Sequence, residues 1–175
     1  MNDIEKTLFL VGRVLVGFFF LVMGLNHFGN LAEMTAMVSA EGIPAPAVAV
    51  IVSGILLVLA GVSFIVGFHP PMGVLAAALF FVPVTLVMHD FWSFEETEAR
   101  WQELNTFLRN VGLLGAVLVF LAIPRPWPMS LDRYLQKWRY GKLVDQERTR
   151  SAEGAEYGDQ SMTEHSTNVE SAGDE

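Results

Sequence analysis

The residues best suited to chemistry lie where long apolar runs begin or end. Histidine and carboxylate side chains can move protons near neutral pH, carboxamides donate and accept hydrogen bonds, and an arginine can neutralise an anion. We therefore assign His89 and Asp90 as candidate catalytic residues. The candidate ligand-binding residues of this group are Asn26, His27, Trp92, Arg109 and Asn110.

The same residue types also suit the ends of membrane helices, so a structural explanation competes with the functional one. Asn and Asp commonly cap helix ends, and a tryptophan such as Trp92 is typical of the aromatic belt at a membrane interface. Two histidines without a spacing motif do not define a metal or haem site, so no metal ligand is assigned.

Arg13 is a further candidate ligand-binding residue, because it lies inside an apolar run. One interpretation is an arginine that extends to the nearby interface, and the other is an arginine that faces the interior of a helix bundle. Arg13, Gly17, Gly24 and His27 fall within about 80° of one another on a helix. Small residues allow membrane helices to approach closely, so this face is expected to be packed and Arg13 to lie on it.

Four long apolar runs must position these residues. They cover residues 8–25, 45–68, 72–88 and 107–123. Runs of about 18 or more apolar residues are long enough to cross a bilayer core of ~30 Å as helices. The chain has 175 residues, 52% of them hydrophobic, and no cysteine. The sequence predicts an all-α fold, a polytopic four-helix membrane bundle in one domain, residues 1–140, in contact with the lipid bilayer. No nucleic-acid partner is expected.

Basic residues near the ends of the runs predict the orientation in the cell membrane. Arg125, Arg133, Lys137, Arg139 and Lys142 follow the fourth run, whereas the loop after the first run has no lysine or arginine. Because cytoplasmic loops carry an excess of basic residues, the C-terminus is predicted to be cytoplasmic. With four crossings, the N-terminus is cytoplasmic too, and the candidate layer around His89 faces outward.

The segment after the fourth run is predicted to form a short interfacial helix over residues 130–140. Ser130 is its expected N-cap, and an apolar face recurs at helical spacing beside basic residues. An ordinary cytoplasmic helix is the alternative. Residues 141–175 hold nine acids and three bases, which account for most of the net charge of −8. Such a polar segment cannot bury enough apolar surface, so an acidic disordered tail is predicted.

Several short motifs in order give a family resemblance. They are residues 11–17 (VGRVLVG), 20–27 (FLVMGLNH), 42–44 (GIP), 89–92 (HDFW), 107–110 (FLRN) and 130–133 (SLDR). Together they resemble the DoxX family of small four-helix membrane proteins, over about residues 8–135. Many members have a glutamate early in the second helix, where this chain reads Val52-Ser53-Gly54. The family's best-known members are described as the membrane subunit of thiosulfate:quinone oxidoreductase.

The resemblance implies a membrane subunit of a redox system, with a quinone as the ligand and a partner redox subunit. In that interpretation His89 and Asn110 bind the quinone oxygens, and Asp90 orients His89 or moves protons. The alternative is a non-catalytic membrane anchor, assembly partner or small-molecule carrier, which the absence of cysteine and of haem or nucleotide motifs favours. The sequence does not distinguish an enzyme from a carrier, and it does not specify the oligomeric state.

Overall fold

Helices form all the regular secondary structure in the part of the chain that the structure describes. The computed structural model describes the backbone of residues 1–171 and the side chains of residues 1–151. In chain order the helices are α1 (Asp3–Gly29), α2 (Leu31–Ala40), α3 (Pro46–Val66), α4 (Pro70–Val87), the short 3₁₀ helix η1 (Phe91–Ser93), α5 (Thr97–Val119), the 3₁₀ helix η2 (Phe120–Ala122) and α6 (Leu131–Ser171). The chain divides into two units, residues 1–133 and 134–175.

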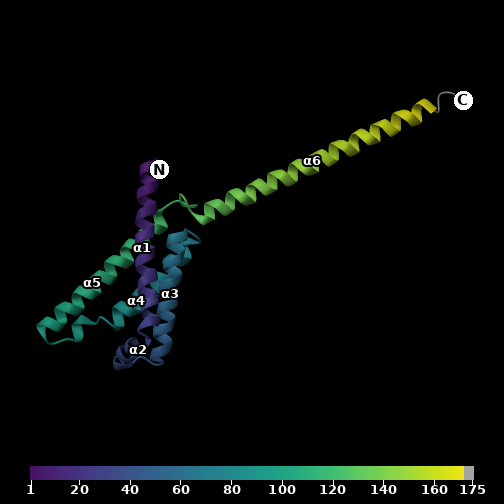
Figure 1. The fold of residues 1–175 in the computed structure, drawn as a ribbon. Helices are drawn as coiled ribbons and strands as arrows, with labels where there is room; N and C mark the ends of the chain where they lie inside the picture. Colours follow the sequence, from purple (N-terminus) through teal and green to yellow (C-terminus); the bar gives the residue numbers. More distant parts are fainter. Residues whose placement is uncertain (172–175) are drawn as a thin grey trace. The chain divides into compact units, whose positions relative to one another are not determined.

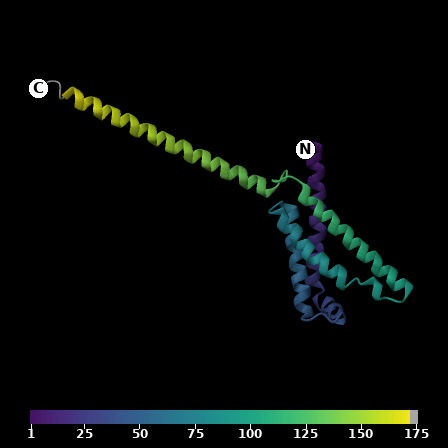
Figure 2. The same cartoon turned by 180° about the vertical axis from the view of Figure 1, so that it is seen from behind.

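Four of these helices confirm the predicted membrane spans and the all-α fold. α1, α3, α4 and α5 are long and apolar enough to cross a bilayer. Figure 1 shows the polypeptide running back and forth through the first unit, with α1 and α3 antiparallel. The start of α1, the turn between α3 and α4, and the segment after α5 lie at one end, which we call the Arg13 end (Figure 2). α2 and η1 lie at the opposite end, which we call the His27 end.

Helix boundaries differ from the prediction in the connections that follow α1 and α4. The connection after the first span contains α2, because Leu31–Ala40 is rich in strong helix formers such as leucine, alanine and methionine. α5 begins at Thr97, well before residue 107, because the polar residues that precede its apolar part include helix-forming glutamate, glutamine and arginine. Residues 97–106, which precede the predicted fourth run, therefore belong to α5.

Close contact between α1 and α3 depends on two pairs of glycines. A Cβ atom at Gly17 would lie 2.8 Å from the Gly61 carbonyl oxygen, and one at Gly24 would lie 2.9 Å from the Gly54 carbonyl oxygen. Both distances are too short for a real side chain, so only glycine allows the two backbones to approach this closely. The buried residues of α1 are Arg13, Gly17, Phe20 and Gly24, which confirms the predicted packed face.

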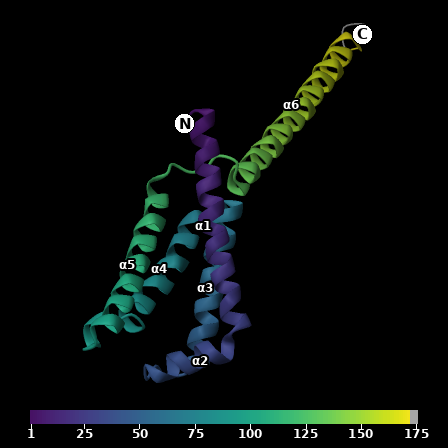
Figure 3. The same cartoon turned by 60° about the vertical axis from the view of Figure 1, so that its left-hand side comes forward.

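The core of the first unit joins α1, α3, α4 and the end of α5. Phe20, Phe64 and Phe81 pack together, with ring centroids 5.9 Å apart for Phe20–Phe64 and 5.7 Å for Phe20–Phe81. α4 lies between α5 and the α1–α3 pair (Figure 3). α5 contributes only Val117 to the buried residues. α5 is therefore the most open of the four spans.

α6 extends well beyond the predicted interfacial helix. Ser130 is its N-cap as predicted, since its hydroxyl oxygen accepts a hydrogen bond from the Arg133 backbone N–H at 3.2 Å. The helix continues to Ser171, beyond its predicted end at residue 140, whereas the disorder predicted from residue 141 stays a prediction. No proline interrupts the segment, and local pairs such as Lys142 above the Trp138 ring, at 4.0 Å, support the helix. Residues 172–175 of the predicted tail lie outside the described residues.

Candidate functional site

Arg13 lies in the interior of the bundle, as one of the two interpretations of the sequence predicted. Its side chain is 1% exposed, although it is only about three turns from the start of α1. Glycine at position 67 makes the space for it, because a Cβ atom there would lie 2.2 Å from Arg13 Nη1. An arginine that extended to the interface would remain exposed, so that interpretation does not describe Arg13.

The guanidinium of Arg13 holds the segment that follows α5. Its Nη2 donates a hydrogen bond to the Met129 carbonyl oxygen, across 116 residues of sequence. The guanidinium carbon lies 5.8 Å from the centre of the Trp127 ring, within the range of a cation–π interaction. Trp127 is 1% exposed and packs edge-on against Phe9 of α1, with ring centroids 5.1 Å apart. The sequence offered no signal for this contact, because Met129 takes part through its backbone.

A groove at the His27 end brings together three polar residues from different parts of the chain. It has a volume of about 550 Å³ and is otherwise lined by apolar side chains of α2, α3 and α4. His27 comes from α1, Ser53 from α3, and His89 from the segment after α4. We call this the histidine groove. A mainly apolar groove with a few polar groups at one place is typical of small-molecule sites.

His27 is held in a defined orientation within the groove. Its Nδ1 lies 2.8 Å from the Met23 carbonyl oxygen, and its ring packs edge-on against Phe80 with centroids 5.8 Å apart. Because a carbonyl oxygen can only accept, Nδ1 carries a proton. In the neutral ring, Nε2 is then a hydrogen-bond acceptor that is available to a ligand.

His89 pairs with Glu103 of α5, a residue that the sequence interpretation missed. The distance from His89 Nδ1 to Glu103 Oε2 is 2.9 Å, and both side chains are about a quarter exposed. The carboxylate orients the ring and favours a proton on Nδ1, which leaves Nε2 for a ligand. The signal for Glu103 was its helical spacing: Glu103, Phe107 and Asn110 share one face of α5, but α5 was expected to begin at residue 107.

Asp90 does not orient His89, which corrects the pairing expected from the sequence. Its carboxylate accepts a hydrogen bond from the Ser93 hydroxyl. Asp90 also precedes η1, and its backbone carbonyl accepts from the Ser93 N–H at 2.8 Å. Its observed contacts are therefore those of a turn residue.

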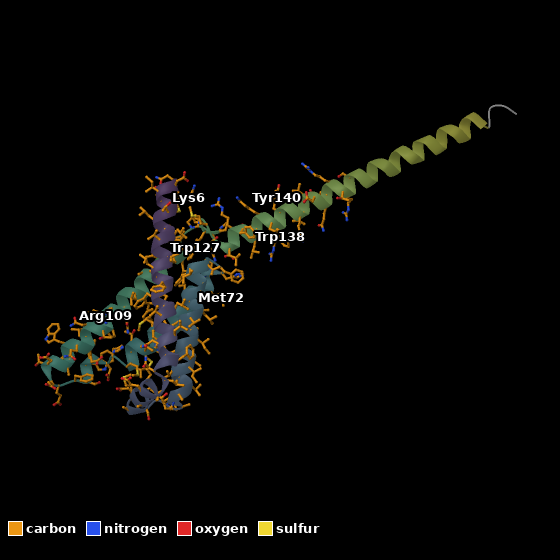
Figure 4. All side chains as sticks on the ribbon, viewed as in Figure 1. Lys6, Met72, Arg109, Trp127, Trp138 and Tyr140 are labelled. Carbon is orange, nitrogen blue, oxygen red and sulfur yellow. The ribbon has the colours of Figure 1, made fainter. Side chains whose placement is uncertain are left out.

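The remaining predicted residues do not line the histidine groove. The Asn26 side chain accepts a hydrogen bond from Asn30 at 2.6 Å, where α1 meets α2. Trp92 is half exposed and packs against Phe107 of α5 with ring centroids 6.1 Å apart. Arg109 is exposed on α5 (Figure 4), and Asn110 is half-buried one residue further on. The predicted layer therefore exists as a level of the bundle, but only its histidines share a groove.

Within the described residues, no group of three or more His, Asp or Glu side chains is placed to hold a metal ion. The histidine groove combines two oriented imidazoles, one hydroxyl and apolar walls, with a carboxylate behind one imidazole. Such a set can hydrogen-bond an uncharged polar head and pass protons to it.

These features define a polytopic membrane protein with an apolar groove that carries two histidines. The DoxX family model matches residues 8–90. The inner membrane protein YphA of Escherichia coli (strain K12) is 30% identical over 131 residues, which cover 74% of this chain and 91% of YphA. The chain belongs to the DoxX family. No solved structure matches it significantly.

Proposed function

We propose that this DoxX-family protein is the membrane subunit of a redox system and binds a quinone head in the histidine groove. The observation that carries the proposal is the pair of oriented histidines, each with Nδ1 already engaged. Quinone oxygens accept hydrogen bonds, and quinol hydroxyls donate them. An imidazole can serve both forms, because Nε2 accepts when neutral and donates when protonated.

The His89–Glu103 pair supplies the proton chemistry in this proposal. Reduction of a quinone to a quinol takes up electrons and an equal number of protons. His89 passes protons to the quinone oxygen, and Glu103, whose side chain is 30% exposed, returns them to the ring. The chain has no cysteine and thus no thiolate-bound cluster, so a partner redox subunit supplies the electrons.

The first test compares His89→Phe with Asp90→Asn, two substitutions at neighbouring positions. Phenylalanine keeps an aromatic ring but can neither donate nor accept a hydrogen bond, so we expect His89→Phe to weaken quinone binding about tenfold, the effect of one lost hydrogen bond of about 1.4 kcal/mol. Asp90→Asn should bind as the wild type does, since Asp90 lies outside the groove lining. The measurement is equilibrium binding of a ubiquinone analogue to the purified protein. Equal affinity for both variants and the wild type would remove His89 from the site.

The proposal places both termini in the cytoplasm and the His27 end at the outer face. A reporter that is active only in the cytoplasm is expected to be active when it is fused after Tyr140. A reporter inserted at Glu96, in the connection between η1 and α5, should report the outside. The reverse pattern would place the histidine groove at the inner face, and the protons would come from the cytoplasm.

A second candidate function is that of an assembly partner, and the open surface of α5 favours it. Gly112 and Gly115 of α5 have no atom within 4 Å of where a Cβ would be, and only Val117 of this helix is buried. Small residues on a membrane helix allow a second helix to approach closely. Substitution Gly112→Leu should leave the protein folded. Loss of a co-purifying membrane subunit in that variant would support the assembly role, and unchanged co-purification would count against it.

A further inference from the structure

A second groove continues from the histidine groove along the contact between α3 and α4. It has a volume of about 730 Å³ and runs toward the Arg13 end, past Leu59 and Val62 of α3. Leu56 of α3 and Leu79 of α4 line both grooves. We call the second one the seam groove. The shared leucines make the two grooves neighbours along the α3–α4 pair. His27 and His89, whose Nε2 atoms are available to a ligand, line only the histidine groove.

The seam groove has an almost entirely apolar wall. Ser63 is one of its few polar residues, but its hydroxyl already donates to the Phe68 carbonyl oxygen at 2.8 Å. His69 lies at the far end and is engaged by Asp132, whose carboxylate accepts from the His69 backbone N–H at 3.0 Å. The wall therefore presents little to a polar ligand, and it suits a hydrocarbon chain.

The two grooves together match the dimensions of a molecule with one polar head and one long tail. From Ser53 to Val66, both of which line the grooves, α3 rises by about 20 Å at 1.5 Å per residue. That length is about two-thirds of a bilayer core of ~30 Å. A short tail would end near Leu56 and Leu79 and leave the seam groove without a ligand.

We infer that one amphiphile occupies both grooves, with its head between His27 and His89 and a single long isoprenoid chain along the seam groove. This inference rests on the proposed function, because it takes the quinone as the head. It adds a specificity determinant, since the residues of the seam groove select the length of the tail. Leu56 and Leu79 form the passage between head and tail.

The absence of cysteine allows a direct test by thiol protection. Leu59→Cys in the seam groove and Leu118→Cys on α5 each create a single thiol at an exposed apolar position, 57% and 47% exposed in the wild type. The purified full-length variants are treated with N-ethylmaleimide in detergent, with no quinone, a short-tailed ubiquinone analogue or a long-tailed ubiquinone. We expect the long-tailed quinone to slow modification of Leu59→Cys at least about tenfold, and the short-tailed analogue to slow it little. Leu118→Cys should react at one rate throughout.

The outcomes separate the inference from the proposed function. If both quinones bind and His89→Phe weakens both, but neither protects Leu59→Cys, the tail lies elsewhere and only this inference fails. If Leu59→Cys reacts equally slowly with and without quinone, bulk lipid or detergent fills the seam groove, and the inference is again overturned. If neither quinone binds, the proposed function fails and the inference fails with it. A second variant, Val62→Trp, changes a residue that lines only the seam groove, and it should weaken the long-tailed quinone about tenfold and leave the short-tailed analogue unchanged.

Discussion

Substitution Gly61→Leu is expected to destroy the packing of α1 against α3. A Cβ atom at position 61 would lie 2.7 Å from both the Gly17 carbonyl oxygen and the Leu21 backbone nitrogen. These are backbone atoms of a helix, so no side-chain rotation relieves the clash, and the helices must separate. Overpacking of this kind costs about 3 kcal/mol, which corresponds to a fall of about 10 °C in melting temperature for a chain of this size.

The matched control for this experiment is Gly112→Leu. Nothing lies within 4 Å of the Cβ position at Gly112, so the larger side chain has room. The change also replaces a poor helix former in α5, which is worth about 1 kcal/mol in favour of the helix. Thermal unfolding of both variants in the same detergent makes the comparison. Similar melting temperatures for Gly61→Leu and the wild type would show that close α1–α3 contact does not hold the bundle together.

Substitution Arg13→Ala is expected to release the segment between η2 and α6. It removes the hydrogen bond to the Met129 carbonyl oxygen and the contact with Trp127, and it leaves a cavity in the Arg13 end. Truncation of a large buried side chain costs about 2–5 kcal/mol. The measurement is thermal unfolding together with protease cleavage, which should now occur near Met129.

Arg13→Met separates the volume of the side chain from its charge. Arg13 Nε and Nη1 have no hydrogen-bond partner among the described residues, so the buried charge is incompletely compensated. Methionine fills much of the same space without that charge, and we expect it to lose clearly less stability than Arg13→Ala. If Arg13→Met were the more damaging substitution, the guanidinium would have a partner beyond Met129.

The four spans and the packed face of α1 were predictable because both depend on local patterns. Span length follows from the bilayer, and the spacing of Arg13, Gly17 and Gly24 follows from helix geometry. The glycine partners on α3 were not predictable in the same way. Their register with α1 depends on where two helices meet, which neither helix encodes by itself.

The sequence predicted which end of the bundle the candidate residues share, but not which of them contact one another. α1 and α4 finish at the same end of the bundle, so the order of the spans is enough to place His27 and His89 there. The choice between Asp90 and Glu103 as the partner of His89 depends on the path of the chain through η1 and on how early α5 begins. Sequence proximity favoured Asp90, whereas the helix places Glu103, fourteen residues away, at 2.9 Å.

The most direct measurement of the central claim is the quinone content of the protein purified in mild detergent. We expect the wild type and Arg109→Ala, whose side chain lies outside the histidine groove, to retain quinone in proportion to protein. The double variant His27→Ala/His89→Ala should retain about a hundredfold less, because two hydrogen bonds of about 1.4 kcal/mol each are lost. Equal quinone content in the double variant and the wild type would contradict a quinone site in the histidine groove.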